Sequence, residues 1–293
     1  DETGVISAAS GIVTINATVK GKGTTEALTI TSTDTQIKGE VSDLSELTLV
    51  GVAADINKVT TSGAQDYSST TTTLNANLKG LSVDLNSVVL GADVTIESTG
   101  LATSTSQDVI ISGTVTGSQK LNIISATTAS LQNSASGLSG IDINAVNADV
   151  MSVSTTGIQD YSGVTGFTTL NGDATIMTIS DGNGFKAGNV VLGEDANDVI
   201  TITLNQGVTS AFNDVTIGTV TGSYGLNIDA LGGDVDLGAV GTSGTSIDSL
   251  TIKSNTTDLN NVFTTGVQDY SNVAGASTLN GDLVSSGNNI VFG

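Results

Sequence analysis

The chain has 293 residues and a formal charge of −21, because 29 Asp and Glu side chains face only 8 Lys and no Arg. It also lacks His, Cys, Pro and Trp. Without His or Cys it cannot form a Ser-His-Asp triad, a cysteine nucleophile or an ordinary zinc site. The negative charge and the missing Arg disfavour nucleic acid and anionic membranes as partners. We therefore expect no enzyme, no nucleic-acid partner and no insertion into a membrane.

The predicted elements are short β-strands from the first residues to the last. The first covers Gly11 to Ile15, and the others centre on triplets in which two apolar residues flank a polar one. This alternation places the apolar side chains on one side of a strand. No stretch has sustained helical spacing, and β-branched residues are abundant, so helix content should be close to nil. The triplets include Leu28-Thr29-Ile30, Leu47-Thr48-Leu49, Ile141-Asp142-Ile143, Ile202-Thr203-Leu204, Leu226-Asn227-Ile228 and Leu250-Thr251-Ile252.

Internal repeats organise the sequence. One phrase occurs at residues 61–68, 155–162 and 264–271, and a Leu-Asn pair follows each copy. The strand Val88-Val89-Leu90-Gly91 returns at residues 190–193, and the chain ends on the similar Ile290-Val291-Phe292-Gly293. These landmarks predict three tandem units, 1–91, 92–193 and 194–293, within one continuous array.

Short strands with a period of about 20–25 residues predict an all-β, parallel β-solenoid of about a dozen coils. One coil is too small to bury its inward side chains, whereas stacked coils join them into a continuous core. Three antiparallel β-sandwich domains of about 100 residues each are the alternative. The solenoid is favoured because the triplets recur inside each unit and no linker-like stretch separates the units.

The repeated phrase reads Thr-Thr-Gly, a hydrophobic residue, then Gln-Xaa-Tyr, with Ser62 replacing Thr in the first copy. Together with Ser249-Leu250-Thr251-Ile252 and the segment from Val88 to Asp93, it resembles the filamentous haemagglutinin-like, β-helical repetitive exported adhesins of bacteria. The resemblance covers all three units. It implies a secreted protein of the bacterial cell surface that is structural or adhesive and needs no cofactor.

The Gln-Asp-Tyr copies are the most prominent candidate site. Asp66, Asp160 and Asp269 could form a ligand-binding ladder along one face. We favour a structural interpretation, in which the glycine permits a turn, the Gln amide bonds to the backbone and the Tyr covers the edge of the core. The structural residues predicted on this basis are Gly63, Gln65, Tyr67, Gly157, Gln159, Tyr161, Gly266, Gln268 and Tyr270.

Two acidic clusters are weak candidates for calcium, which prefers oxygen ligands. Neither matches an EF-hand loop, and the nonapeptide repeat of calcium-binding β-rolls is missing as a series. We therefore expect solvated loops, with at most weak calcium binding and no other cofactor. The candidate ligands are Asp181, Asn183, Asp195, Asn197 and Asp198.

The ends of the array are the candidate assembly surfaces. A solenoid end presents strand N–H and C=O groups that can pair with further strands. We expect identical subunits to associate head to tail, which makes this chain a non-enzymatic structural subunit or segment of an extracellular filament, sheath or surface layer. An adhesin stalk that binds glycans, cells or surfaces through its lateral face is the alternative, and a β-helical polysaccharide-cleaving enzyme is less favoured. The predicted assembly residues are Ile12, Val13, Ile15, Ile290, Val291 and Phe292.

Overall fold

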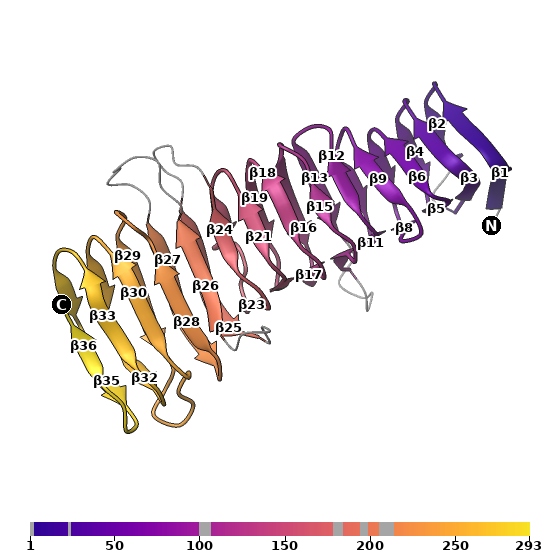
Figure 1. Cartoon of the computed structure of the whole chain (residues 1–293). Helices are drawn as coiled ribbons and strands as arrows, with labels where there is room; N and C mark the ends of the chain where they lie inside the picture. Colours follow the sequence, from indigo (N-terminus) through magenta and orange to yellow (C-terminus); the bar gives the residue numbers. More distant parts are fainter. Residues whose placement is uncertain (1–2, 23–24, 100–106, 178–183, 194–198, 205–213) are drawn as a thin grey trace. The chain divides into compact units, whose positions relative to one another are not determined.

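A computed structural model describes residues 3–22, 25–99, 107–177, 184–193, 199–204 and 214–293. These residues form 36 β-strands and no helix, and the strands of successive turns pair in parallel (Figure 1). The chain is an all-β, parallel β-solenoid of about 13 turns. The predicted fold and the predicted dozen coils are confirmed, and antiparallel sandwiches are excluded.

Two compact units divide the chain. Unit 1 comprises Asp1–Leu138 and Ile143–Val146, and unit 2 comprises Ser139–Asp142 and Asn147–Gly293. The three predicted repeat units describe the periodicity of the sequence and stay a prediction. Strand β19 (Gly140–Asn144) lies where the two compact units meet in sequence.

In unit 1 the long strands β1 and β3 each run through two columns, and from β5 onward each turn contains three strands, each of which pairs with the strand three positions later. This pairing produces three columns of stacked strands, one of which runs β4–β7–β10–β13. The strands are β1 (Thr3–Ile15), β2 (Val19–Lys20), β3 (Ala27–Ile37), β4 (Val41–Leu44), β5 (Glu46–Val50), β6 (Ala53–Ile56), β7 (Val59–Thr61), β8 (Gln65–Tyr67), β9 (Thr71–Leu74), β10 (Leu78–Gly80), β11 (Val83–Leu85), β12 (Val88–Leu90), β13 (Val94–Ser98), β14 (Val109–Ile111), β15 (Val115–Thr116), β16 (Lys120–Ser125), β17 (Thr128–Leu131) and β18 (Ala135–Leu138).

Unit 2 keeps the three columns, and three of its longer strands, β25, β27 and β29, each belong to two of them. Strand β25, for example, pairs through Phe185–Ala187 with β22 and through residues 190–192 with β23. The strands are β20 (Asn147–Val150), β21 (Val153–Thr155), β22 (Gln159–Tyr161), β23 (Thr168–Leu170), β24 (Ala174–Ile176), β25 (Phe185–Leu192), β26 (Val199–Leu204), β27 (Val215–Gly222), β28 (Gly225–Asp229), β29 (Val235–Val240), β30 (Leu250–Ser254), β31 (Thr257–Leu259), β32 (Val262–Thr264), β33 (Gln268–Val273), β34 (Ser277–Leu279), β35 (Leu283–Ser285) and β36 (Ile290–Phe292).

The core lies inside the turns and follows from the alternation of side chains along each strand. In β11, for example, Val83 and Leu85 are buried, whereas Asp84 between them points outward. Most of the three-residue strands in both units repeat this pattern. Inward Val, Ile and Leu of successive turns therefore contact one another, and the hydrophobic effect stabilises the stack rather than any single turn.

The repeated Gln-Asp-Tyr strand lies between two other repeated strands. In the first copy, Gln65 is in register with Leu47 of the preceding turn and with Val83 of the following turn. In the third copy, Gln268 is in register with Leu250 and with Ile290. The apolar triplet is therefore the strand that lies one turn before the motif.

The same stacking corrects one sequence alignment. We predicted that the last strand, β36, is a further copy of the Val88-Val89-Leu90 strand. In the structure β36 pairs directly with the Gln-Asp-Tyr strand, as β11 does in the first copy. The prediction was wrong because it matched apolar residues without counting the strands that separate them.

Candidate functional site

The Gln side chain is the centre of each motif. Gln159 is fully buried, and its Nε2 donates to the carbonyl oxygens of Val153 at 3.1 Å and Thr175 at 3.0 Å. In the third copy, Nε2 of Gln268 donates to the carbonyl oxygen of Val284 at 2.9 Å. The predicted bond between the Gln amide and the backbone is thus confirmed, and it joins neighbouring strands and turns.

The Tyr side chains lie deeper than predicted. Tyr67, Tyr161 and Tyr270 are at most 1% exposed, so they are part of the core and do not cover its edge. Their hydroxyl groups donate to Oε1 of the Gln two residues earlier, at 3.0, 3.3 and 3.1 Å in the three copies. This bond offsets the free-energy cost of burying the hydroxyl, because a buried polar group needs a hydrogen-bond partner. Burial also raises the pKa of all three Tyr side chains above their ordinary range.

A buried Thr completes each cluster, and sequence reasoning missed it. Oγ1 of Thr155 donates to the carbonyl oxygen of Gly157 at 2.6 Å and also accepts from Nε2 of Gln159 at 3.4 Å. Thr61 and Thr264 make the corresponding bonds in their copies. The signal was present, since a Thr stands four residues before every motif Gln.

The motif glycines lie at a bend, and a left-handed backbone is not the reason that glycine stands there. Neither Gly63 nor Gly266 has a positive φ, and Gly157 is not among the positive-φ glycines of the described residues. A Cβ atom at Gly266 would lie 2.8 Å from the carbonyl oxygen of Asp248, and one at Gly63 would overlap the carbonyl oxygen of Ser45. Close approach of the preceding turn therefore requires glycine at these two positions.

The motif Asp side chains make local bonds at the surface. Oδ1 of Asp160 accepts from the backbone N–H of Ser162 at 2.9 Å and from its hydroxyl at 2.6 Å. In the third copy, the corresponding hydrogen bonds from the hydroxyl and the backbone N–H of Ser271 lower the pKa of Asp269. Within unit 2, Asp160 and Asp269 also belong to different columns, because β22 pairs with β25 whereas β33 pairs with β30 and β36. A ladder of these two carboxylates on one face is therefore excluded.

The Leu-Asn pair that follows each motif has a clear role. The Asn side chains donate to a carboxylate on the preceding turn. The apolar partner faces the core, as Leu74 and Leu170 do. These bonds join corners of successive turns, and they are Asn75 to Asp55, Asn171 to Asp149, and Asn280 to Asp258.

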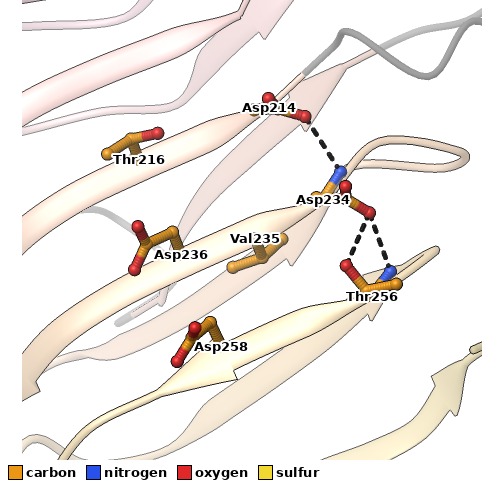
Figure 2. A pocket seen from close by; sticks show the side chains of 7 residues that line it. All are labelled: Asp214, Thr216, Asp234, Val235, Asp236, Thr256 and Asp258. Atoms are coloured by element: carbon orange, nitrogen blue, oxygen red, sulfur yellow. Dashed lines mark hydrogen bonds between the residues drawn. The ribbon is translucent and has the colours of Figure 1, made fainter. Parts of the chain in front are cut away.

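Figure 2 shows an acidic hollow, which has a volume of about 250 Å³ and lies on the outer side of β27, β29 and β31. Asp236 and Asp258 are in register on successive turns. Asp234 accepts from the backbone N–H of Thr256 at 3.1 Å and from its hydroxyl at 2.7 Å. The backbone N–H of Asp234 in turn donates to Asp214 at 3.2 Å (Figure 2). Much of the negative charge thus supplies hydrogen-bond acceptors between turns.

Like charges also meet on unit 1. Asp66 and Asp84 are outward-facing and in register on neighbouring strands. Partial burial, and secondly the charge of Asp66, raise the pKa of Asp84. This pair opposes stacking at neutral pH, since both carboxylates are then negative.

The described residues contain no group of three or more acidic side chains arranged to hold a metal ion. The predicted calcium ligands Asp181, Asn183, Asp195, Asn197 and Asp198 lie outside the described residues. Likewise, no helix that could cross a membrane occurs in the described ranges.

The predicted assembly residues lie on the first and last strands. Ile12 is 61% exposed and Val13 is buried, both on β1, which pairs with β3. On β36, which pairs with β33, the residues Ile290 to Phe292 are all exposed.

Comparison with known proteins gives no relative. No family model matches the chain, and neither a curated protein nor a solved structure matches it. The resemblance to exported bacterial adhesins therefore remains a prediction from the sequence.

Proposed function

We propose that this chain is a non-enzymatic structural module, a β-solenoid segment of an extracellular filament, sheath or surface layer. The observation that carries the proposal is the use of the repeated polar residues. Gln159, Tyr161 and Thr155 are buried and bond to one another and to backbone carbonyls, so their chemistry stabilises the stack. Repetition of such a cluster supports a scaffold more than a reaction site, which would need accessible groups.

The acidic hollow on the outer side of β27, β29 and β31 supports the same interpretation. Glycan binding by an adhesin commonly uses exposed aromatic side chains beside polar groups, because sugar rings pack on aromatic faces. The hollow in Figure 2 is lined by Asp, Thr and Val side chains. Three of its four carboxylates accept hydrogen bonds from a neighbouring turn, and these are Asp214, Asp234 and Asp258. A scaffold role requires no ligand there.

The partner that we propose is a second copy of the chain, joined head to tail through the end turns. Such a contact is heterologous, and repeating it produces an open filament. The proposed place of action is outside the bacterial cell.

Negative-stain microscopy and sedimentation velocity of the purified protein test this function. We expect fibres whose mean length grows with protein concentration, together with no loss of β-sheet circular dichroism. A protein that remains monomeric at high concentration would contradict head-to-tail assembly. Saturable binding on a glycan array by such a monomer would instead favour the adhesin.

A further inference from the structure

An Asn-Gly dipeptide follows the motif in two of its three copies. Asn171-Gly172 and Asn280-Gly281 follow the second and third copies, whereas Asn75-Ala76 follows the first. The glycine of the second copy has a packing reason, because a Cβ atom at Gly172 would lie 2.7 Å from the backbone nitrogen of Ser152 on the preceding turn. The close approach of two turns therefore places a glycine directly after an asparagine.

An asparagine that precedes glycine is chemically labile. The backbone nitrogen of the next residue can attack the side-chain amide carbon of the asparagine, and a side chain on that next residue hinders the attack. Glycine carries no side chain and restricts the backbone least. Asparagine is for this reason among the thermolabile residues of proteins. The packing requirement at Gly172 thus carries a chemical consequence for Asn171.

The first copy provides a matched site in the same chain. Asn75 and Asn171 are both half-buried, and Nδ2 of each donates to a carboxylate on the preceding turn. Among the described residues, no hydrogen bond engages the backbone N–H of Ala76 or of Gly172. The attacking nitrogen is therefore unengaged at both sites, and the residue that carries this nitrogen is what distinguishes them.

We propose that Asn171 is a site of spontaneous deamidation, with water as the only co-reactant. The backbone nitrogen of Gly172 forms a bond to Cγ of Asn171, and Nδ2 leaves as ammonia with the proton from that nitrogen. Water then opens the cyclic imide at one of its two C–N bonds. The product is aspartate or isoaspartate at position 171, and isoaspartate adds one methylene group to the backbone. This inference does not depend on the proposed assembly.

The modification changes a contact between turns. Asn171 donates to Asp149, and a carboxylate at position 171 has no proton to donate at neutral pH. Two negative groups then face each other beside the paired strands β20 and β23, and their repulsion disfavours stacking of these strands. Deamidation therefore loosens this corner of unit 2.

Peptide mapping by mass spectrometry tests the reaction on the folded chain. Incubation at mildly alkaline pH increases the rate, because the attacking nitrogen must lose its proton. We expect aspartate and isoaspartate to accumulate at position 171, while Asn75 in the same sample stays intact. The Ala76→Gly variant should make Asn75 react as well. Retention of Asn171, equal conversion of Asn75 in the wild-type protein, or an intact Asn75 in the Ala76→Gly protein would overturn the proposal.

Two further variants test the consequence for the stack. Asn171→Asp carries one of the two products, and it should lower the urea concentration at the midpoint of the transition in which unit 2 unfolds. Adding Asp149→Asn should restore much of this loss, because the amide and the carboxylate then exchange places across the same contact. An Asn171→Asp protein as stable as the wild type would contradict the loosening. A loss that Asp149→Asn does not reduce would contradict its cause.

Discussion

Replacement of Gln159 by Met tests whether the repeated motif is a structural cluster. Met has nearly the same volume, so the change removes hydrogen bonds with little effect on packing. The side chain loses its bonds to the carbonyl oxygens of Val153 and Thr175, and the hydroxyl of Tyr161 loses its acceptor. The lost bonds and the buried, unpaired hydroxyl together predict a destabilisation of about 3 kcal/mol.

Urea unfolding monitored by far-UV circular dichroism measures this effect. The urea concentration at the midpoint should fall, while the dependence of the unfolding free energy on urea stays constant. The comparison uses the transition in which unit 2 unfolds. Asp160→Asn is the control, because Asn keeps the acceptor for Ser162 at the surface, and it should change stability by less than about 0.5 kcal/mol.

A second substitution separates the hydroxyl from the rest of the cluster. Tyr161→Phe alone should cost about 1 kcal/mol, but in the Gln159→Met protein it should restore about 1 kcal/mol, because it removes the buried hydroxyl that has lost its partner. A Gln159→Met protein as stable as wild type, or an Asp160→Asn protein that is the less stable of the two, would refute the structural interpretation.

Three further predictions concern packing, pH and ions. Gly63→Ala should lower the melting temperature strongly because its Cβ atom would overlap the carbonyl oxygen of Ser45, whereas Gly244→Ala, with no atom within 4 Å of the new Cβ, should have little effect. Asp84→Asn should stabilise the protein by about 0.5 kcal/mol at pH 7, because it removes a partly buried carboxylate and, secondly, its repulsion with Asp66. Because the folded state raises the pKa of Asp84, this gain should disappear in urea unfolding at a pH low enough to protonate the carboxylate, and persistence of the gain there would contradict the cause. Calcium and sodium chloride should both increase assembly by screening the charge of −21, and a tight, saturable calcium site in titration calorimetry would disprove this explanation.

The fold could be predicted from the sequence because its determinants are local. Triplets such as Leu47-Thr48-Leu49 alternate apolar and polar residues, which defines a strand and its inward side. The spacing of these triplets then sets the length of a turn. The Gln-Tyr bond could also have been inferred, since residues two apart in a strand face the same side and Gln65 and Tyr67 are complementary.

Other features depend on which residues become neighbours between turns. The need for glycine at Gly63 comes from the carbonyl oxygen of Ser45, and nothing at residues 62–64 reveals that contact. Positive φ occurs instead at Gly117 and Gly222, the second glycines of the repeated Gly-Thr-Val-Thr-Gly segment. Similarly, the partner of β36 could be identified only by counting strands along the stack.

The spacing of the motif copies differs from a whole number of solenoid turns, and this difference indicates what the repeated motif does. Within unit 2, successive motif copies occupy different columns, so the distance from Gly157 to Gly266 is not a whole number of turns. A repeat selected to display Asp160 and Asp269 as one ligand-binding surface would need them on the same side. Their inward partners Gln159 and Gln268, by contrast, make the same bonds whichever column they occupy. The property that the repetition preserves in unit 2 is therefore the buried cluster, and this favours a scaffold over a lateral binding face.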